Sequence, residues 1–245
     1  MEFDRQIFWE ALTSPAFAAG AGLTIGLAAA AQAAASVLGL VIALLRGSSL
    51  SPVRWAAATY VWLFRAIPTL LQLLFVWNAL PQLIPRLRDP WFTPFIAAFV
   101  ALTLNEAAYM AEIVRSGLAS VDRGQMLAGK TLGLRGDQIF RLIVLPQMIR
   151  VIIPPTGNEF ITLLKLTSLA SVISLRELLT VTSQTVAVNF RFAELYAAAT
   201  IWYLVIVSIF MVLQAQLERR FQWQSRERHA PAAPMLARIA GTANR

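Results

Sequence analysis

The stretch GQMLAGKT, residues 124–131, could bind a nucleotide, because it fits the phosphate-loop pattern G-x-x-x-x-G-K-[ST] at every position. In that pattern the backbone amides of a glycine-rich loop surround the phosphates, and the lysine, here Lys130, reaches the terminal ones. A phosphate loop follows a buried strand and opens a helix inside an α/β domain. The match therefore predicts an ATP site only if the flanking sequence alternates between strand and helix patterns.

The sequence around residues 124–131 lacks that alternation. Apolar residues before the stretch recur at helical spacing, at Ile113, Val114, Leu118 and Val121. The interior letters Gln-Met-Leu-Ala are good helix formers. A membrane-anchored nucleotide hydrolase that uses residues 124–131 as a phosphate loop is therefore kept only as an alternative.

A second set of residues that could take part in chemistry lies inside apolar stretches. Burying an ionisable group there costs free energy, so such a group indicates a substrate pathway or an ion pair. Asn105, Tyr109 and Glu112 are spaced i, i+4 and i+7 and share one helical face, and the same spacing recurs from residue 158 to residue 165. We predict that these two faces meet and line a substrate route. The candidates for this route are Asn105, Glu106, Tyr109, Glu112, Asn158, Glu159, Thr162, Lys165, Thr167 and Ser168.

An α-amino acid would suit this set of groups. Lys165 could bind its carboxylate, and one of three carboxylates could bind its ammonium group, namely Glu106, Glu112 or Glu159.

Each of these residues also has a structural interpretation. Serine and threonine in membrane helices commonly join one helix to another. Glu112 and Arg115 could form an i, i+3 surface pair, and Arg65 is most simply a helix-end charge that snorkels to the interface. Pro154 and Pro155 either break their helix or mark its start.

The composition predicts that a bilayer surrounds the elements that carry these residues. Of 245 residues, 58% are hydrophobic and only 14% are charged, whereas a soluble domain has about a quarter charged. We predict five apolar spans, each long enough to cross the hydrocarbon core, at residues 20–45, 55–84, 91–114, 151–175 and 195–217. With no cysteine and one histidine in a polar tail, we expect no metal site, and we expect no nucleic-acid partner.

The lysines and arginines between the spans predict the orientation, since they favour the cytoplasmic side. With the N-terminus outside, fifteen of them fall on inner segments and five on outer ones. We therefore expect the N-terminus outside, the C-terminus inside, and GQMLAGKT in the cytoplasm.

Read on from Leu127, residues 127–146 resemble the EAA motif of ABC-transporter permeases: Glu-Ala-Ala, three residues, Gly, nine residues, Ile, one residue, Leu-Pro. Ala128, Gly133, Ile143 and Pro146 match it, while Leu127 replaces the Glu and a glycine replaces the second Ala. The segments AAYMAEIVRSGLASVDRGQ, FRAIPTLLQLLF and PPTGNEFITLLKLTSLASVISLRELL look like the polar amino-acid uptake subfamily, histidine, glutamine or glutamate type. The subfamily usually has Asp where this chain has Leu166.

The resemblance, which covers roughly residues 20–217, implies an all-α polytopic membrane protein with five transmembrane helices. It implies a cytoplasmic coupling helix between the third and fourth spans that fits a groove on a separate ATPase subunit. The residues expected to couple are Gln125, Leu127, Ala128, Gly129, Lys130, Gly133 and Pro146. From the residues alone, glycines at 133 and 136 are expected to end that helix, and a second helix is expected over 137–145.

The implied function is that of the permease subunit of an ATP-driven importer of a polar amino acid in the bacterial inner membrane. Its partners would be two ATPase subunits, a second permease chain, identical or not, and an extracytoplasmic solute-binding protein. ATP and Mg would be held by the ATPase, with no cofactor and no covalent chemistry on this chain. A passive channel or secondary carrier is a further alternative, and the particular substrate stays open.

The chain is expected to divide into three parts. Residues 1–19 form an extracytoplasmic segment, residues 20–222 the transmembrane domain, and residues 223–245 a cytoplasmic tail. The tail contains two prolines and no apolar period, so it is expected to be disordered.

Overall fold

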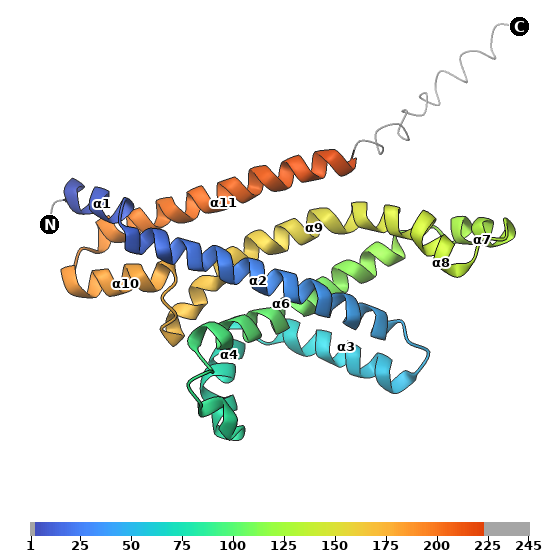
Figure 1. Ribbon diagram of the computed structural model, residues 1–245, viewed down its shortest axis with the longest axis horizontal. Helices are drawn as coiled ribbons and strands as arrows, with labels where there is room; N and C mark the ends of the chain where they lie inside the picture. The colour runs from blue at the N-terminus through green and yellow to red at the C-terminus, as the bar shows by residue number, and fades with distance from the viewer. Residues whose placement is uncertain (1–2, 223–245) are drawn as a thin grey trace, which may run out of the picture.

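The computed structural model describes residues 3–222, so the predicted disordered tail lies outside the described residues (Figure 1). Within that range the chain is helical, without strands, and forms an elongated bundle. Its helical elements are α1 (Arg5–Leu12), α2 (Pro15–Arg46), α3 (Ser51–Ala66), α4 (Thr69–Leu74), η1 (Phe75–Ala79), α5 (Leu80–Leu83), η2 (Pro85–Arg88), α6 (Pro94–Ala119), α7 (Arg123–Thr131), α8 (Gly136–Ile139), η3 (Phe140–Val144), α9 (Leu145–Leu166), η4 (Thr167–Ile173), α10 (Leu178–Asn189) and α11 (Phe192–Gln222).

The predicted all-α membrane fold is confirmed, with one span of unexpected form. Among the described residues, four helical stretches are long and apolar enough to cross a bilayer: Pro15–Arg46, Pro94–Ala119, Gly136–Ile173 and Phe192–Arg220. The second predicted span, 55–84, corresponds to two helices, Ser51–Ala66 and Thr69–Leu83, bent by 104°, and the spans number five if this bent pair is one span. The sequence did not predict the bend.

The bend lies at Pro68, and its cause is local. A proline disfavours helical geometry in the residue before it, and Ile67 is accordingly extended, with φ −88° and ψ 132°. Because Pro68 has no N–H, the carbonyl of Phe64 loses its usual i+4 donor. Side-chain amides replace that donor: Gln72 Nε2 donates to Phe64 O at 2.8 Å and Asn105 Nδ2 at 3.0 Å.

The fourth span is longer than predicted and continuous. The helical run Gly136–Ile173 passes through Pro146, Pro154 and Pro155, so neither a break at 154–157 nor a helix end at Pro146 is found. Just before Pro146 the helix takes one π-helical turn, in which Leu145 N donates to Phe140 O five residues back. Such turns loosen the backbone ladder and let a helix absorb a local mismatch.

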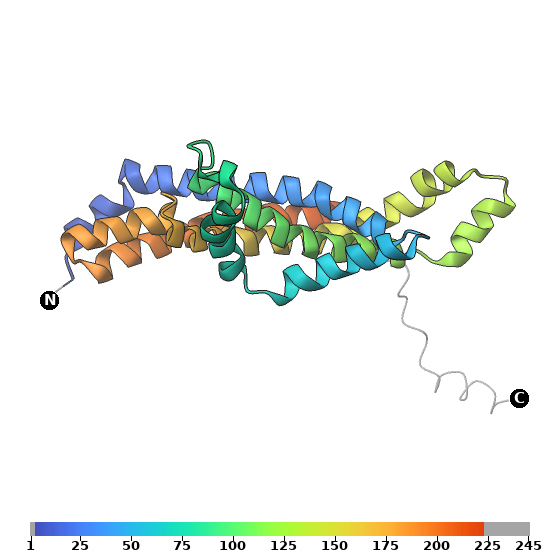
Figure 2. The ribbon, with the colours of Figure 1, turned by 90° about the horizontal axis from the view of Figure 1, so that it is seen from below.

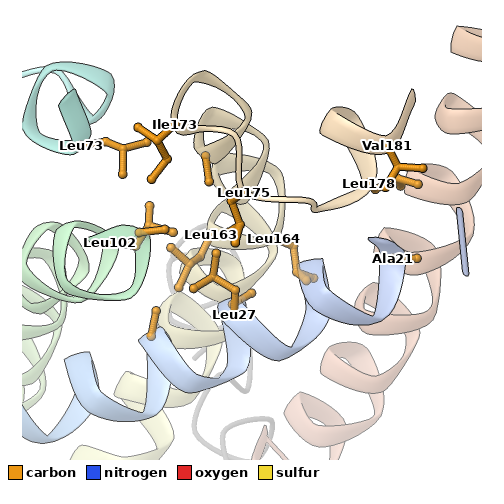
Figure 3. Packing of buried hydrophobic residues seen from close by; sticks show 14 of the residues in the cluster. Ala21, Leu27, Leu73, Leu102, Leu163, Leu164, Ile173, Leu175, Leu178 and Val181 are labelled. Carbon is orange, nitrogen blue, oxygen red and sulfur yellow. The ribbon is translucent and has the colours of Figure 1, made fainter. Parts of the chain in front are cut away.

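Small residues let α2 and α6 approach closely, as is common between membrane helices. A Cβ atom on Gly39 would lie 2.5 Å from Met110 Cβ and 2.9 Å from Ala107 O, so glycine is required there. The main apolar cluster brings leucines from four parts of the chain together (Figure 3). These are Leu27, Leu73, Leu102, Leu163 and Leu164.

The two ends of the bundle differ. At one end, α1 and α10 cover the start of α2 and α11, while α7 and α8 form a hairpin that extends beyond the other end (Figures 1 and 2). Glu177 caps α10, accepting from the backbone N–H groups of Leu179 and Thr180 and from the hydroxyls of Thr180 and Tyr203. Burial raises the pKa of the Glu177 carboxyl, and the four hydrogen bonds oppose that shift.

Candidate functional site

GQMLAGKT forms an ordinary α-helix and not a phosphate loop. It makes up most of α7, whose first turn is capped by Asp122, with Gly124 N donating to Asp122 Oδ1 at 2.5 Å. The helix ends at Gly133, which has φ +79°, and Leu134 N then donates to Gly129 O at 3.0 Å. Because the amides of 124–131 lie along a helix and no strand precedes it in residues 3–222, the nucleotide-hydrolase alternative is not favoured.

The hairpin of α7, α8 and η3, residues 123–144, has its own small core. Val121, Ile139 and Val144 are buried in it. Gln147 Nε2 donates to Gln125 Oε1 at 2.6 Å and ties the start of α7 to α9. A Cβ atom on Gly129 would lie 2.9 Å from Ile143 Cδ1, so the glycine that completes the phosphate-loop pattern faces the hairpin core.

The outer face of this hairpin is apolar and exposed. Leu127 is 62% exposed and Leu132 81% exposed, and Ala128 and Lys130 are exposed beside them. Of the other predicted coupling residues, Gly133 closes α7 and Pro146 lies exposed within the helix that follows. Gly136 does not close α7, as the sequence had suggested, but begins α8. The exposed leucines make this face of the projecting hairpin a candidate interaction surface.

Three arginines converge on Glu112 near one end of the bundle. Arg46 of α2 contacts Glu112 Oε1, Arg115 Nη2 lies 2.7 Å from Glu112 Oε2, and Arg65 Nη1 of α3 lies 3.8 Å from Oε1. The predicted Glu112–Arg115 pair is therefore present. It belongs to a larger cluster that joins α2, α3 and α6.

Arg65, interpreted from the sequence as a helix-end charge that snorkels to the interface, has a side chain that is 46% exposed. Besides approaching Glu112, its guanidinium lies 5.3 Å from the centre of the Tyr109 ring.

Helices α6 and α9 pack together where Gly117 of α6 faces Ile152 and Met148 of α9. Glu106 of α6 is only 1% exposed, and its Oε1 atom has no hydrogen-bond partner among the described residues. Asn105, one residue away, is used structurally, because its side chain bonds Phe64 O and Thr69 Oγ1.

Two residues of the predicted face Asn158, Thr162 and Lys165 lie next to α11: Asn158 accepts a hydrogen bond from it, and Lys165 lines a cavity that α11 also lines. Gln214 Nε2 of α11 donates to Asn158 Oδ1 at 3.0 Å. The hydroxyls of Thr162, Thr167 and Ser168 donate to backbone carbonyls three or four residues back in their own helical run.

Lys165 lines a cavity of about 440 Å³ between the end of α9, α10 and α11. Its other lining residues include Ser168, Leu179, Thr200 and Tyr203. Within residues 3–222 no ion pair joins Lys165 to another side chain. The cation can therefore meet a ligand in this cavity.

The chain matches one protein family over most of its length. The family described as "Binding-protein-dependent transport system inner membrane component" matches residues 35–223.

Curated relatives cover nearly the whole chain. The "Probable amino-acid permease protein YxeN" of Bacillus subtilis is 38% identical, over 87% of this chain and 95% of that protein. The "Arginine transport system permease protein ArgU" of Corynebacterium glutamicum is 41% identical, over 81% and 66%. The "Glutamine transport system permease protein GlnP" of Escherichia coli is 34% identical, over 91% and 99%.

A solved structure shares both fold and sequence with the chain. The "Crystal structure of an amino acid ABC transporter with histidines" contains a chain that is 34% identical, with a TM-score of 0.82. The similarity covers 90% of this chain and 100% of that chain.

Proposed function

The chain belongs to the family of binding-protein-dependent transport system inner membrane components and is a multi-pass permease subunit of an ABC importer, and we propose that it imports a polar amino acid. The family implies an ATPase partner and a substrate-binding protein partner, with ATP hydrolysis on the separate ATPase subunit. The relatives are named for arginine, glutamine and unspecified amino acids, so their names support the class and not one member of it.

Our proposal that the chain couples to its ATPase rests on the α7–α8 hairpin. It projects from one end of the bundle, has its own small core, and exposes Leu127 and Leu132 (Figure 2). Gln125 of α7 accepts a hydrogen bond from Gln147 of α9, so a displacement of the hairpin would be transmitted to α9, which belongs to a membrane span. We propose that this hairpin end is cytoplasmic and binds the ATPase, which places the N-terminus outside and the C-terminus inside.

The assembly that we propose contains two permease chains, identical or not, and two ATPase subunits. The solute-binding protein would deliver substrate at the opposite end, near α1 and α10. This chain would bind no cofactor, and ATP and Mg would be held by the ATPase. The route would run along α6 and the helical run Gly136–Ile173, which carry the residues predicted from the sequence.

Uptake by the reconstituted complex tests the proposal. The permease, its ATPase and its binding protein are placed in proteoliposomes with ATP inside or outside, and labelled L-arginine, L-glutamine and L-glutamate are offered. We expect ATP-dependent accumulation of at least one of them. Accumulation that needs neither ATP nor the ATPase would indicate a passive channel or secondary carrier instead.

Lys165→Ala tests the cavity at the end of α9. Loss of one charge-assisted hydrogen bond to a substrate carboxylate is expected to raise the KM for uptake by about tenfold, which is about 1.4 kcal/mol. Arg5→Ala, which removes an exposed cation from α1, is the matched control and should leave KM unchanged. If KM and substrate-stimulated ATPase activity both stay at the wild-type level, Lys165 has only a structural role.

A further inference from the structure

A large cavity lies on the side of the bundle, between α2, α6, α9 and α11. Its volume is about 730 Å³, many times the ~30 Å³ that a water molecule occupies in the liquid, and most of its wall is apolar. Leu40, Leu213 and Leu217 of the wall are between 43% and 50% exposed, so the cavity opens to the outside of the bundle. Because the bundle spans a membrane, either lipid or another membrane helix lies outside this opening.

Two polar atoms of the cavity wall have no partner among the described residues. They are Oε1 of Gln32, a residue only 9% exposed, and the hydroxyl of Thr156. The side-chain amide of Gln32 donates to Met110 Sδ at 3.2 Å, so its oxygen still needs a donor. A cavity of this size leaves room for a water molecule at each of these atoms beside a larger, apolar occupant.

The α9 and α11 walls of the cavity run antiparallel (Figure 1), and two contacts set their register. The rings of Phe160 and Phe210 pack with their centres 4.9 Å apart. One turn further along α11, Gln214 Nε2 donates to Asn158 Oδ1 at 3.0 Å and to Pro154 O at 3.2 Å. Lower residue numbers on α9 therefore lie level with higher residue numbers on α11.

Two arginines follow in this register, one helical turn beyond the cavity and towards the α7–α8 end. Arg150 precedes Ile153 by three residues and Arg220 follows Leu217 by three, so each shares the helical face that lines the cavity. Both arginines are exposed, and no ion pair within residues 3–222 involves either of them. The carboxylate of Glu218, two residues before Arg220, bonds a glutamine of its own helix instead. This end of the cavity therefore presents two cations that can bind an anion.

From this arrangement we propose that the cavity binds an anionic phospholipid from the leaflet on the α7–α8 side. One acyl chain lies in the cavity, and Arg150 and Arg220 bind the phosphate of the headgroup. Basic pockets between membrane helices bind anionic headgroups in this way, and a guanidinium group matches the geometry of a phosphate. The proposal requires only that the chain spans the membrane, so it does not depend on which substrate is carried.

A second permease chain is the alternative cover for this opening. A two-fold contact brings the same surface of both chains together. If such a contact were centred on the cavity, the arginines of one chain would lie near those of the other. Like charges repel, whereas an anionic headgroup neutralises both arginines of one chain. The charge at this end of the cavity therefore favours lipid.

Native mass spectrometry of the permease–ATPase complex, released from detergent micelles, measures the bound lipid directly. The probes are phosphatidylglycerol, which is anionic, and phosphatidylcholine, which has no net charge, with the same acyl chains. Inorganic phosphate is added as a competitor without a chain. Basal ATPase activity shows that each variant complex is assembled.

Two variants and two matched controls separate the headgroup from the chain. Arg150→Gln/Arg220→Gln removes the cations, and Arg219→Gln is its control, because Arg219 is equally exposed but points about 100° away from Arg220 around α11. Ile153→Trp fills the cavity from its wall. Val212→Trp adds a similar side chain at an exposed position of α11 outside the cavity wall.

We expect wild type to bind phosphatidylglycerol about thirtyfold more tightly than phosphatidylcholine, which is about 2 kcal/mol shared by two arginines. Arg150→Gln/Arg220→Gln should abolish that preference and Arg219→Gln should keep it. Ile153→Trp should weaken the binding of both lipids, whereas Val212→Trp and inorganic phosphate should not. Absence of the preference in wild type, its survival in the assembled double variant, or unchanged lipid binding by Ile153→Trp overturns the proposal.

Two further variants test the other occupants. The chain has no cysteine, so Leu213→Cys places a single thiol at the opening. Oxidation of that variant should give no disulfide-linked pair of permease chains, and such a pair would show that a second copy covers the opening. Gln32→Leu should not weaken the binding of phosphatidylglycerol. Loss of binding there would show that a hydrogen-bond donor, and not an acyl chain, fills the cavity, and either result overturns the proposal.

Discussion

Replacing Glu112 by glutamine is expected to lower the midpoint of thermal unfolding, Tm, of the purified permease by about 4–8 °C. The change leaves Arg46, Arg65 and Arg115 without their shared counter-charge at the ends of three helices. Surface pairs contribute under about 1 kcal/mol, and breaking a buried pair costs about 3–5 kcal/mol. Glu112 and Arg46 are each 22% exposed, so we expect an intermediate cost of about 2 kcal/mol, which gives that shift for a chain of this size.

Removing one arginine as well should reverse part of the loss. In Arg46→Gln/Glu112→Gln the remaining repulsion is weaker, so its Tm should lie above that of Glu112→Gln alone. Glu10→Gln, which removes an exposed carboxylate that pairs with no arginine within residues 3–222, should shift Tm by no more than about 1 °C, since such surface changes stay within about 0.5 kcal/mol. An unchanged Tm in Glu112→Gln would show that solvent already screens the repulsion among the three arginines.

Gly133→Val is expected to reduce ATP-driven uptake by about tenfold while leaving membrane insertion intact. Gly133 has φ +79°, a conformation that costs an L-residue about 1–2 kcal/mol and a β-branched residue more. A Cβ atom there meets no heavy atom of the described residues within 4 Å, so the effect acts through the backbone and not through a clash. Valine should tilt or unwind the end of α7 and misplace Leu127 and Leu132.

Gly136→Val is the matched control for this experiment. Gly136 also has open space around its Cβ position among the described residues, but its φ is not in the left-handed region. It should therefore keep near wild-type uptake. Basal ATPase activity of the Gly133→Val complex separates uncoupling from loss of assembly, and equal uptake by the two variants would contradict a coupling role for the turn at Gly133.

The sequence predicted the positions of the membrane helices well, because each such helix is recognised from the hydropathy of its own residues. Long charge-free runs identify 20–45 and 195–217, and the structure extends both by several residues. The bend at Pro68 and the continuity of α9 through Pro146, Pro154 and Pro155 were not predicted. Prolines in a membrane helix break it or not according to what else satisfies the freed groups, and those partners come from distant helices.

The side chains of the candidate site were also hard to place from the sequence, because their partners lie on distant helices. Spacing placed Asn105, Tyr109 and Glu112 on one face of α6, but it could not show that Asn105 would be used to satisfy the carbonyl of Phe64. Nor could it show that the Arg65 guanidinium of α3 would lie 5.3 Å from the centre of the Tyr109 ring of α6. On α9, spacing favoured Asn158, Thr162 and Lys165, but it could not show that Asn158 would bond Gln214 of α11.

ATP hydrolysis by the purified chain in lipid, alone and with its ATPase subunit, tests the central claim most directly when wild type is compared with Lys130→Ala. Lys130 is the lysine of the phosphate-loop pattern, and it is exposed on α7. We predict that the chain alone is inactive, that the complex hydrolyses ATP, and that Lys130→Ala keeps most of that activity. Hydrolysis by the chain alone that Lys130→Ala abolishes would contradict the account, because GQMLAGKT would then bind the nucleotide itself.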